Sequence, residues 1–377
     1  MQKRYIEKLG ITLSTFGVGC MRYPMKEENG KKVIDEEQSI QMIRTAIDNG
    51  VNYMDTAYVY FDGESEKVLG KALLDGYREK TYVATKLPTW HCNTYEDFEK
   101  SFNIQLERLQ TDWIDFYLVH SLNKDSWKKA KDLGVCKFLD ELKASGKIKY
   151  ACFSFHDSYD VFEDIINSYD WDMCQIQFNF MDINNQAGEK GLKLAGEKKI
   201  PVVIMEGLLG GRLAKAPENV QALYDAFPIK RTPVEWAFRW IANYKEVAVI
   251  LSGVSNMEQT LDNIRIFDEV GIDIMSEDEL ALINKVREAY QSRTKVNCTA
   301  CKYCMPCPKG VNIPRVFAVW NNAYQYSQNI AGNWTYKKMI DEKTSAQECI
   351  NCRKCVKVCP QKIDIPMMLK QADIELK

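Results

Sequence analysis

The sequence predicts an α/β protein built as a (β/α)8 barrel and followed by a small, mainly helical domain. Three observations support this fold class. Over roughly the first 290 residues, short apolar runs alternate with stretches of helical periodicity, as expected for parallel strands joined by helices. The apolar runs number eight, which fits a closed TIM-type barrel better than an open sheet. No GxGxxG motif opens a helix after the first strand, which argues against a doubly wound sheet.

The chain opens with an amphipathic stretch, residues 5–13, that predicts two extended pieces around Lys8-Leu9-Gly10 and hence an N-terminal hairpin. Asp35 and Gln38 then have the spacing of a capping box at the start of a helix, and Gly50 suits the C′ position at the end of that helix. Two further helices are predicted at Tyr95–Leu109 and Ser276–Tyr290. The eight predicted strands are Thr15–Gly19, Val51–Asp55, Tyr82–Thr85, Ile114–Val119, Ile148–Ser154, Met173–Gln177, Pro201–Met205 and Val247–Leu251.

Composition limits the classes of function. The 377 residues include 50 Lys and Arg against 52 Asp and Glu, a net charge of −2 that gives no indication of a nucleic-acid partner. No apolar run approaches the roughly 18 residues of a membrane span, and the N-terminus lacks the apolar segment of a secretory signal. We therefore expect a cytoplasmic protein with neither a membrane nor a nucleic-acid partner.

Eight of the thirteen cysteines lie after residue 297, in two clusters. Disulfides are rare in the cytosol, so clustered cysteines there more often bind metal. The same tail, residues 296–377, has twelve Lys and Arg against six Asp and Glu, while the remainder is acidic. This basic tail either offsets an anionic cofactor or is simply a basic surface. We expect one domain at residues 1–292 and a second at 293–377.

The ends of the predicted strands carry polar candidates, because reactive groups of such barrels lie where strands end. Asp55 begins the stretch Asp55-Thr56-Ala57-Tyr58-Val59-Tyr60, Lys86 follows the third strand, and His120 follows the fourth. Each of these residues alone has a plain structural explanation, such as a helix cap or a solvated charge. Residues 106–115, which lead into the strand before His120, complete the pattern.

Together these motifs resemble the aldo/keto reductase family over residues 1–290. The resemblance implies an oxidoreductase that reduces a carbonyl substrate, with Asp55, Tyr60, Lys86 and His120 as catalytic residues. The chemistry agrees. A tyrosine with an ordinary pKa near 10 is a poor acid at neutral pH, and a neighbouring ammonium, held by a carboxylate, lowers that pKa. Tyr60 would be the general acid, and His120 would orient the carbonyl.

The resemblance also implies where a nicotinamide cofactor binds, although several positions depart from the family pattern. Phe155 stands where an Asn is expected, Met205 replaces an aromatic residue, and Gly253 and Gln259 replace basic residues that grip a 2′-phosphate. We expect NAD(P)H, with FMN in the same place as an alternative. The implied cofactor-binding residues are Ser154, Gln175, Met205, Leu208, Gly210, Gly253, Gln259 and Asn263.

The two cysteine runs begin at Cys298 and Cys349. The second has the C-x₂-C-x₂-C-x₃-C-P spacing of bacterial ferredoxins, and the first is one residue shorter before its final Cys-Pro. The tail thus resembles a ferredoxin domain with two [4Fe–4S] clusters; zinc is the alternative. The resemblance implies that one cluster is bound by Cys298, Cys301, Cys304 and Cys359, and the other by Cys307, Cys349, Cys352 and Cys355. Helices are predicted between the runs at Ile313–Gln328 and Lys337–Glu348.

Three functions remain open from the sequence. The barrel could reduce carbonyls with NAD(P)H while the clusters are structural or serve docking of a partner. Because a hydride carries two electrons and a cluster passes one, the clusters could instead feed a flavin in the barrel, with a ferredoxin or another electron carrier as partner. A non-reductase reading is an electron-transfer or redox-sensing protein. The sequence does not identify the substrate.

Overall fold

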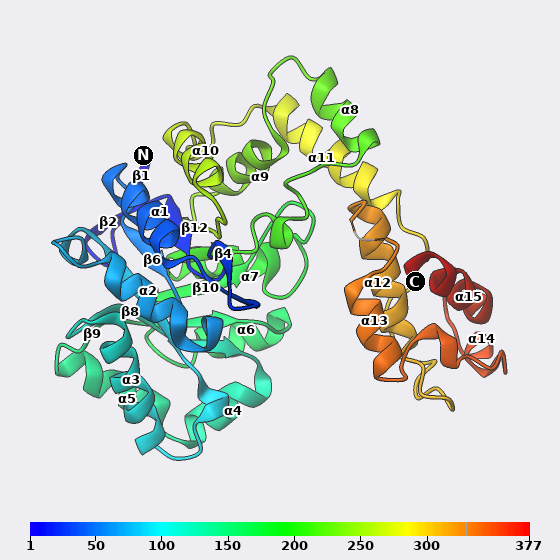
Figure 1. Ribbon diagram of the computed structural model, residues 1–377, viewed down its shortest axis with the longest axis horizontal. Helices are drawn as coiled ribbons and strands as arrows, with labels where there is room; N and C mark the ends of the chain where they lie inside the picture. Colours follow the sequence, from blue (N-terminus) through cyan, green and yellow to red (C-terminus); the bar gives the residue numbers. More distant parts are fainter. Residues whose placement is uncertain (329) are drawn as a thin grey trace. The chain divides into compact units, whose positions relative to one another are not determined.

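A computed structural model describes residues 1–328 and 330–377 of the chain (Figure 1). Eight parallel strands form a closed barrel in the order β10-β11-β12-β3-β6-β7-β8-β9. This arrangement confirms the predicted (β/α)8 fold. The barrel strands are β3 (Phe16–Gly19), β6 (Tyr53–Asp55), β7 (Tyr82–Leu87), β8 (Ile114–Leu122), β9 (Ile148–Phe155), β10 (Met173–Gln177), β11 (Val202–Met205) and β12 (Val247–Ser252).

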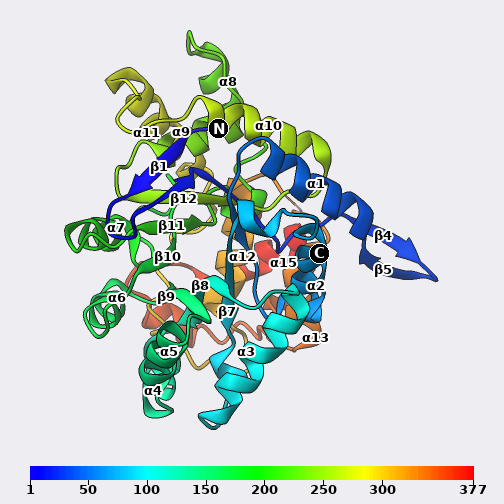
Figure 2. The same ribbon diagram turned by 90° about the vertical axis from the view of Figure 1, so that its left-hand side faces the viewer.

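Helices lie outside these strands, as Figure 2 shows for the side of α3 to α7. The Asp35 side chain accepts a hydrogen bond from the Gln38 backbone N–H, so Asp35 is the N-cap of α1, and Gly50 after its end has φ +92° as predicted. The predicted capping box is incomplete, because the Asp35 N–H donates to the Pro24 carbonyl instead of the Gln38 side chain. The helices of residues 1–291 are α1 (Glu36–Asp48), α2 (Glu64–Ala72), α3 (Glu96–Leu109), α4 (Lys124–Asp132), α5 (Val135–Ala144), α6 (Tyr159–Ile166), α7 (Gly188–Glu197), α8 (Glu218–Ala226), α9 (Pro233–Ala242), α10 (Met257–Asp268) and α11 (Glu277–Gln291).

The predicted N-terminal hairpin is formed by β1 (Lys3–Ile6) and β2 (Ile11–Ser14). Its Ile6 and Leu13 belong to one buried cluster with barrel residues such as Phe116 and Val203. The hairpin therefore closes the end of the barrel at which the strands begin, and the opposite end remains for chemistry. A second hairpin, β4 (Met25–Glu28) with β5 (Lys31–Ile34), extends beyond α1 in Figure 2 and was not predicted.

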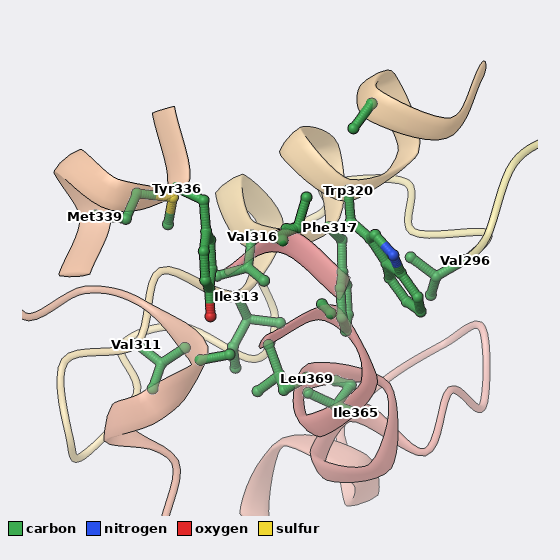
Figure 3. Packing of buried hydrophobic residues seen from close by; sticks show 14 residues of the cluster. Val296, Val311, Ile313, Val316, Phe317, Trp320, Tyr336, Met339, Ile365 and Leu369 are labelled. Atoms are coloured by element: carbon green, nitrogen blue, oxygen red, sulfur yellow. The ribbon is translucent and has the colours of Figure 1, made fainter. Parts of the chain in front are cut away.

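The C-terminal helices pack on a core of their own (Figure 3). Phe317 and Trp320 of α12 lie with Ile365 and Leu369 of α15 in a buried cluster that the partly buried cysteines flank. The helices of this region are α12 (Ile313–Gln325), α13 (Trp334–Asp341), α14 (Lys354–Lys357) and α15 (Ile365–Leu376).

Internal contacts divide the chain into two compact units. The first comprises residues 1–210 and 237–275, and the second comprises residues 211–236 and 276–377. Helices α8 and α11 therefore group with the cysteine-containing tail, through pairs such as Tyr290 with Tyr326, whose ring centroids are 5.3 Å apart. The domain boundary after residue 292 remains a prediction. In the part of the chain described, no helix is both long and apolar enough to span a membrane.

Candidate active site and cysteine cavities

A buried ion pair lies at the carboxyl ends of the barrel strands. Lys86 Nζ is 2.6 Å from Asp55 Oδ1 and donates a second hydrogen bond, 2.7 Å long, to the carbonyl of Thr56. Lys86 and Asp55 are only 1% and 3% exposed. These two oxygen acceptors stabilise the charged form of Lys86, because the hydrogen bonds to them replace bonds to the water that the ammonium lost on burial.

Tyr60 lies over this pair. The Lys86 ammonium is 5.0 Å from the centre of the Tyr60 ring, and the ring meets that of His120 edge to face, with centroids 6.2 Å apart. The four residues predicted to be catalytic therefore come together, although they derive from three separate segments of the chain.

The pKa shifts at this site have clear causes. Burial opposes the charge on Lys86, but Asp55 and Tyr60 more than compensate, and its pKa is raised. Burial raises the pKa of Asp55, and Lys86 acts against this. Burial also raises the pKa of Tyr60, and the neighbouring Lys86 lowers it without reversing the shift. The ammonium thus has the expected lowering effect on the pKa of Tyr60, but burial outweighs it, and the expected net lowering is wrong.

His120 is neutral at physiological pH. Burial first, then the positive charges of Lys86 and His156, lower its pKa well below 6.5. The pairing of β8 with β9 shifts register between Val119 and Leu122, and Ser121 within that shift has φ +53°. This bulge turns the end of β8 locally, as bulges beside functional sites do. The Nδ1 atom of His120 is buried and has no hydrogen-bond partner in the described structure.

The turn that carries Tyr60 is conformationally strained. Phe61 and Asp62, the next two residues, both have left-handed φ values, +50° and +55°. Such residues cost on the order of 1–3 kcal/mol each and persist only where the surroundings fix them. Arg108 provides part of this support: its guanidinium donates to the Tyr58 carbonyl at 3.0 Å and lies so close to Gly63 that a methyl group there would come within 2.4 Å of Cζ.

A second buried hydrogen-bond network contacts the backbone of Lys86, and the sequence did not predict it. Glu66 is fully buried and accepts hydrogen bonds from Thr85 (2.6 Å), Gln105 (2.9 Å) and Arg108 (3.0 Å). Gln105 also donates to the Lys86 carbonyl at 3.1 Å. Gln105 and Arg108 lie within or beside the segment that carries the family resemblance, but nothing in the sequence alone pairs them with Glu66.

Two of the predicted cofactor-binding residues lie beside the tetrad. Gln175 Nε2 is 3.4 Å from Asp55 Oδ2, and its Oε1 is buried without a partner in the described residues. Ser154 Oγ accepts a hydrogen bond from the Ser121 N–H at 2.7 Å. Phe155, where an Asn was expected, is instead buried against Phe162 of α6 with ring centroids 5.2 Å apart.

The remaining cofactor candidates follow β11 and β12. Met205 ends β11 and is half-buried, and Leu208 and Gly210 lie in the loop after it. Gly253 and Gln259 are exposed, while Asn263 is buried on α10 and donates to Ser252 Oγ at 2.9 Å. Met205 and Gly253 lie at or next to strand ends, whereas Gln259 and Asn263 lie on α10.

Arg22 is a residue that the sequence analysis missed. A methyl group at Gly253 would lie 3.3 Å from Arg22 Cβ, and one at Gly210 would lie 3.5 Å from Arg22 Nη2. The arginine therefore runs across two predicted cofactor positions, one of which lacks the basic residue usual in the family. Arg22 and Gly253 are 231 positions apart in the chain, so only the fold reveals their proximity.

The eight clustered cysteines line two cavities. Cys298, Cys301, Cys304 and Cys359 line one of about 20 Å³, together with Phe317 and Ile365. Cys307, Cys349, Cys352 and Cys355 line another of about 200 Å³, which Cys304 also borders. The groups agree with the two predicted ligand sets. Burial raises the pKa of Cys304 to about 11, with neighbouring thiols adding to the shift.

In the described part of the chain, the cysteine sets do not form a compact site for a single metal ion. Within the described residues, no three or more His, Cys, Asp or Glu side chains are close enough to hold a single metal ion. Zinc needs four ligands converging on one point at about 2.3 Å.

A barrel with a Tyr-Lys-Asp-His site at its strand ends is an oxidoreductase architecture, and sequence comparison identifies the family. Residues 15–288 match the aldo/keto reductase family model, so the chain belongs to the aldo/keto reductase family. Residues 297–363 match the model of a 4Fe-4S dicluster domain. The protein is therefore an aldo/keto reductase-type oxidoreductase with a C-terminal iron–sulfur domain.

Individual relatives cover parts of the barrel. Aldo-keto reductase YhdN of Bacillus subtilis is 37% identical over 129 residues, which are 32% of this chain and 38% of that protein. Methylglyoxal reductase YeaE of Escherichia coli is 29% identical over 153 residues, 40% of this chain and 48% of its own. A Klebsiella pneumoniae aldo-keto reductase solved in complex with NADPH shares the fold, with TM-score 0.61, 22% identity and coverage of 76% of this chain and 96% of that one.

Proposed function

We propose that the barrel reduces the carbonyl group of a small aldehyde or ketone, with Tyr60 as the general acid. The observation that carries this proposal is the buried Lys86–Asp55 pair lying against the Tyr60 ring. A charged pair buried this deeply costs desolvation energy, so a role in chemistry explains it better than a role in stability.

Each member of the tetrad has a defined task. When bound, NAD(P)H supplies the hydride that the carbonyl carbon receives. The neutral imidazole of His120 donates a hydrogen bond to the carbonyl oxygen, and Tyr60 passes its hydroxyl proton to that oxygen. Because the product alcohol is a weaker acid than a phenol, this proton transfer is favourable. The resulting Tyr60 phenolate is stabilised by the Lys86 ammonium until a proton from water restores it.

The residues beside the tetrad fit a nicotinamide. Among the described residues, Gln175 Oε1 and His120 Nδ1 are buried polar atoms without hydrogen-bond partners, and such atoms in native proteins call for an explanation. An amide-bearing cofactor ring would supply a donor to Gln175, and Arg22 would meet its phosphates. The NADPH named for the Klebsiella relative agrees with this assignment.

FMN is the competing cofactor. The visible spectrum of the anaerobically purified protein distinguishes the two, since flavin bands that persist after removal of the clusters would overturn the nicotinamide assignment. The nicotinamide assignment instead predicts that the protein without flavin binds NADPH, which nicotinamide fluorescence measures.

Aromatic side chains next to His120 support a proposal for the substrate class. Trp90 lies 5.0 Å from His120 between ring centroids and is 44% exposed, and His91 packs against Trp90 and Tyr58. Aromatic walls of this kind suit a compact carbonyl compound. Given a relative named methylglyoxal reductase, we propose small aldehydes, including 1,2-dicarbonyls, as the substrates to assay first.

In the C-terminal domain we propose two [4Fe–4S] clusters. Cys298, Cys301, Cys304 and Cys359 would bind one, and Cys307, Cys349, Cys352 and Cys355 the other. The two cysteine-lined cavities support this assignment, and so does the ferredoxin spacing of the second run. We also propose that a ferredoxin-type carrier exchanges electrons with these clusters.

Tyr60→Phe tests the barrel chemistry. The variant keeps the ring that packs on His120 and removes the acid, so kcat for NADPH-dependent aldehyde reduction should fall by about 10²–10⁴-fold. NADPH affinity and iron content should stay unchanged. An active Tyr60→Phe enzyme would remove this residue from the proton-transfer step.

A further inference from the structure

One face of the C-terminal unit combines exposed apolar side chains with positive charge. It surrounds the cavity of Cys307, Cys349, Cys352 and Cys355. Three large side chains on its rim are well exposed: Tyr303 (69%), Ile350 (59%) and Val358 (50%). Apolar groups gathered at one place, rather than scattered singly, are typical of a surface that a partner covers. We name the six residues Tyr303, Lys309, Ile350, Arg353, Lys354 and Val358 the basic face.

The charges of the basic face have a single sign. Lys309, Arg353 and Lys354 line the cavity, and none of its described lining residues is an Asp or a Glu. Arg353 is paired with Asp364 at 3.1 Å, which leaves Lys309 and Lys354 as the exposed charges of the rim. Lysines that only offset a cluster's negative charge need no apolar ring around them, so the combination points to recognition of an acidic surface.

Cys352 brings the metal site to this face. It is one of two exposed members of the cysteine sets, the other being Cys301. The cavity of Cys301 is smaller, and Lys302 is the charged residue among those that line it. The larger cavity thus combines an exposed thiol, apolar rim and charge, and is the better point for an electron to enter or leave.

We propose that the basic face docks an acidic ferredoxin and exchanges single electrons with it. The carrier loses one electron, one cluster of the C-terminal unit gains it, and no bond or proton changes; the reverse transfer is balanced in the same way. This inference rests on the proposed two-cluster assignment and names the surface and the chemistry of the partner. Iron analysis of the unaltered protein tests that assignment separately.

Binding of an acidic two-cluster bacterial ferredoxin to the anaerobically prepared holoprotein is the direct experiment. We expect the dissociation constant to rise with salt between about 20 and 300 mM, because exposed charges are screened over about a Debye length. Lys309→Glu combined with Lys354→Glu should weaken binding at low salt by at least about tenfold. Tyr303→Ser should weaken it without changing the salt dependence.

Lys31→Glu combined with Lys32→Glu is the matched control. It reverses two exposed charges on the β4–β5 hairpin and should leave ferredoxin binding unchanged. If the Lys309/Lys354 reversal lowers iron content, the doubly neutral Lys309→Gln/Lys354→Gln variant replaces it, and loss of the salt dependence is the expected result.

Three outcomes would overturn the proposal. They are ferredoxin binding that the Lys309/Lys354 variants leave intact, no ferredoxin binding by the iron-replete protein at low salt, and salt-sensitive self-association that depends on the same lysines. The last result would assign the basic face to a second copy of this chain, whose remainder is acidic.

Discussion

The barrel site and the cysteine cavities differ in how they are held together. At the barrel site, Lys86, Asp55 and Glu66 are buried, and each takes part in side-chain hydrogen bonds of 2.6–3.0 Å: Lys86 with Asp55, and Glu66 with Thr85, Gln105 and Arg108. In the C-terminal unit, none of the eight clustered cysteines is fully buried, and Cys301 and Cys352 are exposed. The first site is held by contacts within the polypeptide; the second consists of partly exposed thiols that line two cavities.

This difference indicates where each site obtains its stability. A preorganised polar site stores electrostatic energy in the fold, and its geometry does not depend on the cofactor. A set of thiols around a cavity gains its order from metal binding, as metal sites couple to folding. The two sites should therefore respond in opposite ways to mutation and to chelation.

Lys86→Met should give the largest loss of stability. It leaves the Asp55 carboxylate buried without its partner, which costs about 3–5 kcal/mol of unfolding free energy. Urea unfolding followed by barrel tryptophan fluorescence measures the effect, and adding Asp55→Asn should recover part of the loss.

Lys71→Met is the control for that measurement. Lys71 forms an ion pair of the same kind with Glu36 at 2.7 Å, but both side chains are 45% exposed. An exposed pair contributes about 0–1 kcal/mol. Equal losses for the two variants would contradict the view that burial gives the Lys86 pair its importance.

Loss of one clustered cysteine should lower the iron content of the C-terminal unit and leave the barrel unchanged. Cys349→Ala removes a proposed ligand of one cluster, and bound iron should fall by about half while the barrel retains its NADPH-dependent activity. Cys136→Ala, at a half-buried cysteine outside both cavities, should keep all its iron. Iron analysis and visible absorption measure the bound iron of both variants. Unchanged iron content in Cys349→Ala would exclude Cys349 from the cluster ligands.

Arg22→Met should weaken dinucleotide binding by about tenfold, ~1.4 kcal/mol. The arginine crosses Gly253 and Gly210, where cofactor phosphates are expected. If NADH and NADPH lose affinity equally, Arg22 binds the diphosphate; if only NADPH does, it binds the 2′-phosphate. Titration by nicotinamide fluorescence tests this, with Lys32→Met as a charge-matched control, and unaltered affinity for both would exclude Arg22 from the site.

The smallest expected effect is that of pH. Burial raises the pKa of Tyr60 and lowers that of His120, so the acid stays protonated and the imidazole neutral between about pH 6.5 and 10. In the free enzyme, kcat/KM for aldehyde reduction should therefore be flat across this range, falling only outside it. A descending limb centred near pH 8 would show that Lys86 outweighs burial at Tyr60.

Periodicity predicted the barrel because each strand is a buried apolar run bounded by turns. It missed the β4–β5 hairpin, whose strands are charged and largely exposed. Asn29-Gly30, with φ +51° and +72°, is the turn signal that could have revealed it. In the tail, the predicted helix from Ile313 ends at Gln325 rather than Gln328, and a helix begins at Trp334, where Asn333 caps it, rather than at Lys337.

The residues of the candidate site likewise include some that the sequence predicted and some that it did not. Asp55, Lys86 and His120 lie at the carboxyl ends of buried strands, so sequence position alone placed them at one end of the barrel. Glu66 and Arg22 lie on surface-like sequence and acquire their roles only through partners distant along the chain. Contacts of that kind have no local signature.

The grouping of α8 with the C-terminal unit bears on how such a chain can be taken apart. Residues 211–236 leave the barrel directly after the Met205–Gly210 segment and return to it before α10. A tail produced from residue 293 onward would lack both α8 and α11, and would expose Tyr326, which packs on Tyr290. The C-terminal unit is thus made of two chain segments, and a single cut after residue 292 would divide it. Each fragment would then expose side chains, Tyr290 on one and Tyr326 on the other, that pack together in the intact chain.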